Sequence, residues 1–190
     1  MQEKRVDYWD KVRDIEPENL IFLDESGSNL ALTRLYARSL KGLRAYGDRP
    51  SQRGQNVSIV GAVSLNGLVS SFNVLGAYDG LTFEAFVVRH LVPQLWKGAC
   101  VIMDNCSIHK GKEIRKAIEK VGARLIFLPP YSPDFSPIEN LWSKLKSYLK
   151  KLEARTYPAL VDAVEKGFAA ISRKDIYNWF THCCYCTSSF

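Results

Sequence analysis

Long hydrophobic stretches are missing from this sequence, and so is an apolar leader. No run of apolar residues approaches the roughly 20 that are needed to span a bilayer. The opening segment, MQEKRVDYWDKVRDI, is charged where a signal peptide would have its apolar core. We therefore exclude a helical membrane protein and expect a cytoplasmic one.

Cysteine is also scarce, and its pattern suits neither disulfides nor zinc. The chain has 5 cysteines, an odd number without a secretory context, which argues against a disulfide framework. Cys183 and Cys186 form one C-x-x-C pair beside His182, but a zinc site normally needs a second pair of ligands. We expect a frayed or packed tail there. Repeats, low-complexity tracts and linkers are missing too, so residues 1–190 are expected to form a single domain.

Acidic residues are outnumbered, with 20 Asp and Glu against 26 Lys and Arg, for a net charge of +6. This excess favours an anionic partner. It is concentrated in residues 34–53 and 144–151, where it either makes solvated surface or contacts phosphate groups. The candidates for phosphate contact are Arg34, Arg38, Lys41, Arg44, Arg49, Arg53, Lys144 and Lys146.

Short apolar runs predict strands at residues 20–23, 57–63, 69–75, 100–103 and 125–128. Asn66-Gly67, between the second and third runs, is a strong signal for a two-residue hairpin. The last two runs are separated by a helical segment, a spacing that implies a parallel crossover. The sequence thus predicts an α/β fold whose sheet has an antiparallel hairpin and parallel strands.

Helices are predicted from apolar periodicity and capping residues. They are expected at residues 82–95 with Thr82 as the cap, at 113–121, and after the caps Ser136, Thr156 and Ser172. In the helix after Ser136 one stripe contains Ile138, Leu141, Trp142, Leu145, Leu149 and Leu152. The last third of the chain is therefore expected to pack as helices against the sheet.

Two acidic residues stand directly after predicted strands. Asp24 follows residues 20–23 and Asp104 follows residues 100–103. If these strands are parallel neighbours, both carboxylates reach the edge of the sheet where ligands bind in such folds. Because two adjacent carboxylates repel each other unless a cation lies between them, the pattern suggests a divalent metal site. An acid in this position can also simply cap a turn, and spacing alone leaves both interpretations open.

Glu139 is a third candidate, at 139 − 104 = 35 positions beyond Asp104. A short loop after the preceding strand could return it to the same edge of the sheet. Ser136-x-x-Glu139 also fits a capping box, in which the Glu side chain bonds back to the cap residue's N–H. The spacing of Glu139 does not decide between these two roles.

Three sequence blocks resemble the D-D-E transposases of bacterial insertion sequences and their mariner-like relatives. The blocks are LIFLDES, VIMDNCSIHKG and LPPYSPDFSPIENLWSKLKSYL, and the third is the most specific. The resemblance covers about residues 20–171 and implies a ribonuclease-H-like fold, a mixed sheet flanked by helices. It implies that Asp24, Asp104 and Glu139 are the catalytic, metal-binding triad. Asn105, His109 and Asn140 are candidates for supporting the triad, or for only ordering the chain locally.

By this resemblance the chain is a Mg²⁺-dependent enzyme that cleaves double-stranded DNA at the ends of a mobile element and joins them to target DNA. Two Mg²⁺ ions, for which Mn²⁺ can substitute, are expected, with Asp24 between them. Active complexes of such enzymes pair subunits, so a homodimer on the chromosome is expected. Two other interpretations stay open: a catalytically inactive DNA-binding remnant, and a ribonuclease-H-like nuclease for RNA–DNA hybrids.

One departure from the family pattern concerns the start of the chain. Relatives usually carry an N-terminal helix-turn-helix region that recognises the element's ends, and the residues before Asp24 leave no room for it. The expectation is therefore a catalytic domain whose end-recognition domain is absent. It is either a domain separated from a longer chain or a downstream reading frame normally joined to a DNA-binding part.

Overall fold

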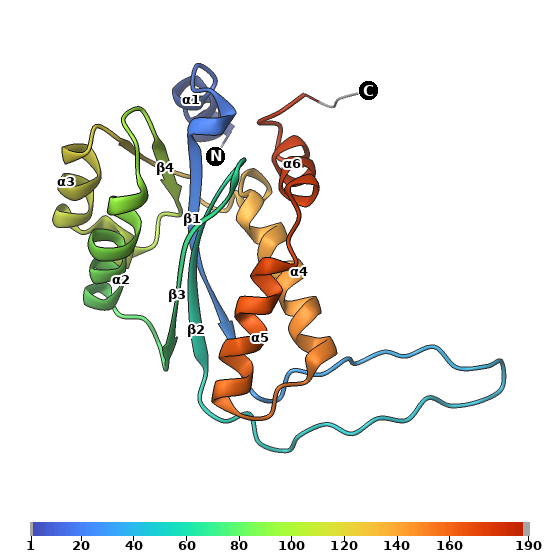
Figure 1. The fold of residues 1–190 in the computed structure, drawn as a ribbon. Helices are drawn as coiled ribbons and strands as arrows, with labels where there is room; N and C mark the ends of the chain where they lie inside the picture. The colour runs from blue at the N-terminus through green and yellow to red at the C-terminus, as the bar shows by residue number, and fades with distance from the viewer. Residues whose placement is uncertain (1, 188–190) are drawn as a thin grey trace.

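The computed structural model describes residues 2–187, which form a five-stranded sheet with helices on both faces (Figure 1). The strand order is β3-β2-β1-β4-β5. The first three strands pair antiparallel, whereas β1 and β4, and β4 and β5, pair parallel. The bounds are β1 Leu20–Ser28, β2 Val57–Ser64, β3 Gly67–Leu75, β4 Cys100–Met103 and β5 Arg124–Phe127. The predicted mixed α/β sheet with a hairpin is confirmed.

Strand β1 is longer than predicted, and this changes the position of Asp24. The apolar run ends at Leu23, but the ladder to β2 continues from Asp24, which pairs with Gly61, to Ser28, which pairs with Val57. Asp24 therefore lies inside the strand and not at its end. The prediction was wrong because the apolar run stops at Leu23, whereas the backbone pairing with the buried strand β2 continues beyond it.

The helices are α1 Gln2–Val12, α2 Gly80–Phe86, α3 Lys112–Lys120, α4 Pro137–Leu152, α5 Tyr157–Ala169 and α6 Arg173–His182. The sequence analysis did not predict α1. Thr156 and Ser172 cap α5 and α6 as expected, each accepting a bond from a backbone N–H. Within residues 2–187 no helix has both the length and the apolarity needed to cross a membrane.

The helix predicted at residues 82–95 is the least accurate of the helical predictions. Its cap is Asp79, whose side chain accepts a 2.7 Å bond from the Thr82 N–H. Beyond α2 the chain continues as a π-helical turn (Val87–Leu91) and a 3-10 turn (Val92–Gln94). Pro93 explains the break, because proline has no N–H for an α-helical bond and its ring clashes with the preceding turn.

Alternating residues of β1 face two separate cores. Leu20 and Phe22 pack in the core beneath α4, α5 and α6, whereas Ile21 and Leu23 pack in the core beneath α2 and α3. Side chains of successive strand residues point to opposite faces, so Asp24 continues the first series. Of the predicted α4 stripe all members are buried except Leu152, which is 47% exposed at the last residue of the helix.

A long excursion separates β1 from β2, and we refer to residues 29–56 as the arm. It runs away from the sheet and back without helix or strand (Figure 1). Its base is closed by a 3.1 Å bond from the Leu30 N–H to the Arg53 carbonyl. The Arg155 guanidinium, just after α4, donates to the carbonyls of Leu30 and Leu32. The base of the arm is thus tied to the connection between α4 and α5.

Candidate active site

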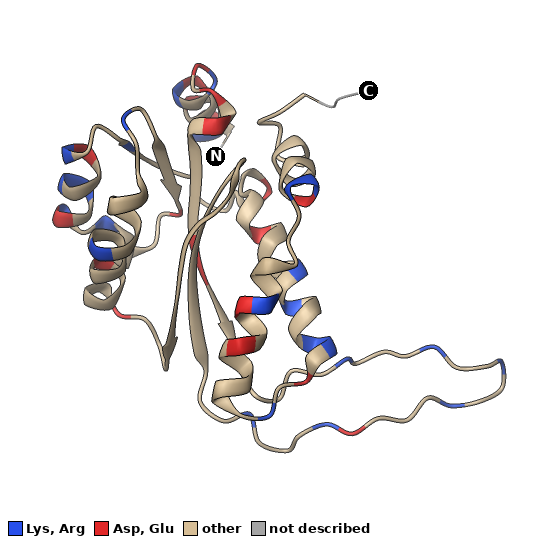
Figure 2. Cartoon of the chain, viewed as in Figure 1, with Lys and Arg blue, Asp and Glu red and all other residues tan. Residues whose placement is uncertain are grey.

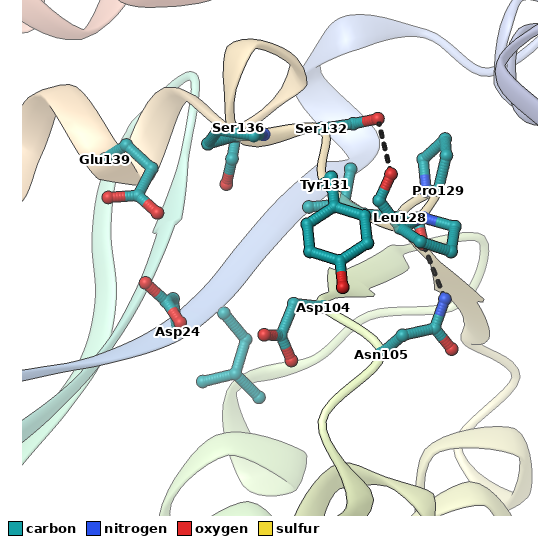
Figure 3. Close-up of a pocket in the computed structure, with 12 residues that line it drawn as sticks. Asp24, Asp104, Asn105, Leu128, Pro129, Tyr131, Ser132, Ser136 and Glu139 are labelled. Atoms are coloured by element: carbon teal, nitrogen blue, oxygen red, sulfur yellow. Dashed lines mark hydrogen bonds between the residues drawn. The ribbon is translucent and has the colours of Figure 1, made fainter. Parts of the chain in front are cut away.

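A cleft of about 450 Å³ opens at the edge of the sheet where β1 and β4 direct their carboxylates (Figure 3). Asp24 of β1, Asp104 directly after β4 and Glu139 in the first turn of α4 all line it. In Figure 3 the carboxylates of Asp104 and Glu139 are directed toward Asp24. The parallel pairing of β1 with β4 explains why the first two meet, and the loop from β5 to α4 returns the third.

Asp24 is the most buried of the three acids. Its Oδ2 accepts a 2.9 Å bond from Trp142 Nε1 of α4. Burial raises the pKa of Asp24 to about 7, and the neighbouring carboxylates Glu139 and Glu25 add to the rise, against the opposing effect of the Trp142 bond. Near neutral pH this carboxyl group is therefore poised to bind either a proton or a cation.

Asp104 has the opposite electrostatic environment. His109 Nδ1 lies 2.6 Å from its Oδ1, and the Cys106 N–H donates to the same oxygen at 2.8 Å. The bond from His109, the largest effect, lowers the pKa of Asp104. Burial lowers the pKa of His109, but its bonds to Asp104 and Glu25 outweigh this effect and raise the pKa to about 10. Asp104 is therefore ionised and His109 protonated at neutral pH.

Glu139 does not take part in the capping box that its spacing allowed. Ser136 is the residue before α4, but its side chain makes no capping bond, and Ser136 itself lines the cleft. The Ser136 N–H, from which the Glu139 side chain would accept in a capping box, instead donates to the Pro133 carbonyl at 3.0 Å. The side chain is exposed and faces the cleft. The geometry therefore disfavours a purely capping role.

The three supporting candidates occupy different places. Asn105 lines the cleft, and its side-chain amide donates a 2.8 Å bond to the Leu128 carbonyl, which ties the ends of β4 and β5 together. His109 is buried behind the cleft against Asp104. Asn140 is half-buried on α4 and is not among the described residues that line the cleft. The structure thus brings two of the three into contact with the site.

Two residues that the sequence analysis did not single out as site residues also bond to the site, one to Asp24 and the other to His109. Trp142 was predicted only as part of an apolar stripe, yet its indole N–H is bonded to Asp24. Glu25 bonds His109 Nε2 through both carboxylate oxygens, at 2.9 and 3.0 Å. Two features of the sequence could have indicated these residues: a tryptophan on the apolar stripe has a polar N–H that needs a partner, and Glu25 is an acid adjacent to Asp24.

The rim of the cleft is formed by the segment between β5 and α4. Tyr131 on this rim is 90% exposed and has a φ of 55°, a left-handed conformation that is strained for a bulky residue. Such strain is found where the surrounding structure determines the chain path, often at functional sites. The Pro-Pro-Tyr-Ser-Pro block thus forms one side of the cleft, beside Asp104.

The predicted phosphate-contacting residues fall into two groups. The six on the arm are all exposed, and Figure 2 shows basic positions spread along it. Lys144 instead forms an ion pair with Asp175 of α6, so contact with phosphate would compete with that pair. Lys146 is half-buried on α4. The basic residues of the arm are therefore more accessible for contact with phosphate than Lys144 and Lys146 are.

The chemistry of the acids in the cleft fits a divalent cation. Carboxylate oxygens are the hard ligands that Mg²⁺ and Mn²⁺ prefer. Asp24 is half-buried with carboxylate neighbours that raise its pKa, a repulsion that a bound cation would relieve. Within residues 2–187 no three His, Cys, Asp or Glu side chains are close enough to form a complete metal cluster. The acids therefore surround the cleft and are not gathered at one point.

A mixed sheet of this order, with acids from β1, β4 and a following helix around one cleft, defines a ribonuclease-H-like domain with a carboxylate-lined site. Comparison with known families agrees. The sequence model of the family described as DDE superfamily endonuclease matches residues 19–161, and the chain belongs to that family.

Individual relatives support the same assignment. The Tc1 transposase of Caenorhabditis elegans is 26% identical over 95 residues, which cover 50% of this chain and 35% of the relative. A Mos1 transposase paired-end complex with the left transposon end has the same fold, with a TM-score of 0.78 at 14% identity, over 96% of this chain and 57% of that one. The Mos1 mariner transposase catalytic domain superposes with a TM-score of 0.66 at 11% identity, over 96% and 85%. This chain thus spans only part of the longer relatives.

Proposed function

We propose that this chain is a catalytic domain that cleaves and rejoins DNA during transposition. The observation that carries the proposal is the placement of Asp24, Asp104 and Glu139 around one cleft in a DDE superfamily chain. The relatives are transposases, and the Mos1 structures include complexes with a transposon end and with Mn or Mg.

Phosphoryl transfer needs charge neutralisation and in-line geometry more than reactive side chains. We propose that Asp24, Asp104 and Glu139 would hold two Mg²⁺ ions, for which Mn²⁺ can substitute. When bound, such ions activate the attacking oxygen and stabilise the leaving one. The residues of the chain hold the ligand oxygens in place: Trp142 orients Asp24, and His109 with the Cys106 N–H orients Asp104.

The reaction would take place in two displacements. Water attacks the phosphodiester at the element's end, the bond from phosphorus to the 3′-oxygen breaks, and a free 3′-hydroxyl results. That hydroxyl then attacks a target phosphodiester, joining the strands and releasing a target 3′-hydroxyl. The acids need form no covalent bond to DNA.

We further propose that two copies act together, that the arm and Lys146 contact the DNA backbone, and that a separate DNA-binding part supplies end recognition.

A cleavage assay tests the proposal. The purified chain should cleave duplex DNA in the presence of Mg²⁺ or Mn²⁺, and Glu139→Gln should abolish cleavage while the fold is retained, as measured by circular dichroism. Glu165→Gln, an exposed position on α5, is the matched control and should cleave normally. Retained cleavage in Glu139→Gln would rule out the proposed triad.

The same assay separates the other interpretations. A preference for an RNA–DNA hybrid over duplex DNA would assign the chain to another ribonuclease-H-like nuclease. Binding of DNA without binding of Mn²⁺ and without cleavage would identify an inactive remnant. Both results contradict the transposase proposal.

A further inference from the structure

His109 joins two acidic residues that come from different parts of the chain. Its ring is 1% exposed. On one side Nδ1 lies 2.6 Å from Asp104 Oδ1, and on the other side Nε2 lies 2.9 and 3.0 Å from the two oxygens of Glu25. The Phe83 ring packs against the imidazole, with ring centroids 4.4 Å apart. The orientation of His109 is therefore determined by bonds at both nitrogens and by packing on its face.

Glu25 reaches His109 from the side of the sheet opposite Asp24. Adjacent residues in a strand point to opposite faces, and Asp24 is bonded to Trp142 of α4 on the other side. Glu25 is largely buried, with 19% of its side chain exposed, and it is not among the described residues that line the cleft. Its carboxylate bonds to the site through His109, and its charge also acts on Asp24, whose pKa it helps to raise.

This linkage determines which oxygen of Asp104 is available. Oδ1 accepts bonds from both His109 and the Cys106 N–H, at 2.6 and 2.8 Å, so Oδ2 is the oxygen left for a ligand. The Asp104 side chain is 54% exposed, so the surrounding protein covers less than half of it. Without the His109 bond the carboxylate would be freer to rotate, and a loosely held ligand binds metal less tightly.

We propose that Glu25 is a positioning residue, which fixes the ring of His109 so that His109 holds Asp104 with one carboxylate oxygen directed to the cleft. The inference rests on the proposed function, because it assigns Asp104 a metal-binding role. It goes further in giving a role to Glu25, an acid outside the cleft. Partners that support metal ligands commonly change metal affinity by about 10- to 100-fold when removed.

Mn²⁺ affinity, measured by electron paramagnetic resonance on the whole chain, tests the proposal without any DNA. Glu25→Gln has nearly the same shape and should weaken Mn²⁺ binding by about 10- to 100-fold. Glu165→Gln should leave the affinity unchanged. Because Glu25 acts through His109, the variant Glu25→Gln in a His109→Asn background should lose no more affinity than His109→Asn alone. Unchanged affinity in Glu25→Gln, or additive losses in the double variant, would overturn the inference.

A crystal structure of metal-free Glu25→Gln separates this inference from the proposed function. The expected result is a His109 ring turned away from Asp104 and an Asp104 carboxylate in a new rotamer. If both side chains keep their wild-type positions, the inference fails even where the protein binds Mn²⁺. If wild-type protein binds no Mn²⁺, the proposed function fails, and the rotamers of Asp104 and His109 still decide the positioning role.

Discussion

At the scale of single residues, the pKa values of the two aspartates in the cleft are shifted in opposite directions. Burial and neighbouring carboxylates raise the pKa of Asp24 to about 7, while the bond from His109 lowers the pKa of Asp104. The environments differ because Asp24 receives one side-chain bond from a neutral indole, whereas Asp104 faces a protonated imidazole. A cation that binds in the cleft would therefore displace a proton from Asp24, whereas Asp104 is already ionised.

Asp24→Asn should stabilise the metal-free protein near neutral pH. The folded-state pKa of Asp24, about 7, lies above the ordinary value of 3.8. Between these values the unfolded chain has lost a proton that the folded chain retains, so wild-type stability falls as the pH rises through this window and then stays level. The amide removes that loss. We expect a Tm gain of at least about 2–4 °C at pH 7.5, the shift that ~1 kcal/mol produces in a chain of this size, and none near pH 3.

Asp104→Asn is the matched control, with the opposite sign. A lowered folded-state pKa contributes stability above the ordinary value, and this contribution is lost as the pH falls through the folded pKa. Asp104→Asn should therefore lower the Tm at pH 7.5, with a difference that shrinks in acid. Thermal unfolding between pH 3 and pH 8 measures both variants. A lower Tm for Asp24→Asn at pH 7.5 would contradict the electrostatic account of the cleft.

At the scale of secondary structure elements, the site depends on how closely α4 approaches β2. Gly61 of β2 is paired with Asp24, and a Cβ at Gly61 would lie 2.9 Å from Cη2 of Trp142. Glycine therefore makes the space in which the indole lies over the sheet and reaches Asp24. The small residue in β2 and the large one in α4 form a single packing unit.

Gly61→Ala should reduce both stability and cleavage. The added methyl group is too close to the Trp142 ring, and overpacking of this kind costs about 1–3 kcal/mol. Because Trp142 must move, its bond to Asp24 is lost or lengthened, and single-turnover cleavage should fall more than unfolding alone explains. Urea unfolding and single-turnover kinetics measure the two effects. Gly47→Ala on the arm, where a Cβ meets nothing within 4 Å, is the control, and equal behaviour of the two variants would refute the packing argument.

At the scale of the whole molecule, the arm is the most unusual feature. Residues 29–56 leave the sheet between two paired strands, and connections of this length without helix or strand are uncommon in compact domains unless they have a function. Its basic residues are exposed and spread along its length (Figure 2). Beyond its base, where Leu30 and Leu32 pack against the core, the arm therefore adds exposed positive charge.

Replacing Arg38, Arg44 and Arg49 together with Gln should weaken DNA binding and leave the fold unchanged. All three side chains are exposed, so the Tm should not move. The slope of log affinity against log salt should fall by about 0.9 for each arginine that contacts a phosphate. Fluorescence anisotropy over a salt series measures this. Replacing Lys97, Lys120 and Lys174, which are exposed but lie off the arm, is the control. An unchanged slope for the arm variant would exclude the arm from the DNA interface.

Much of the fold could be predicted from the sequence because its signals are local. The five strands, the hairpin at Asn66-Gly67 and the caps Thr156 and Ser172 depend on residues within a few positions of one another. The resemblance to D-D-E transposases identified the family that the comparison then confirmed. The resemblance of the three sequence blocks, and not the spacing of the acids alone, predicted that Asp24, Asp104 and Glu139 would share a cleft.

Other features were decided only by the tertiary structure, because they depend on partners far away in the chain. Strand β1 extends past its apolar run because β2 supplies backbone bonds. Glu139 is outside the capping box because the path of the chain from β5 to α4 bonds the Ser136 N–H to the Pro133 carbonyl. Glu25 lies 84 positions from His109, so no local pattern indicates their bond. The sequence by itself determined the five strands, most of the helices and which acids meet, and the packing of distant segments decided which groups hold those acids in place.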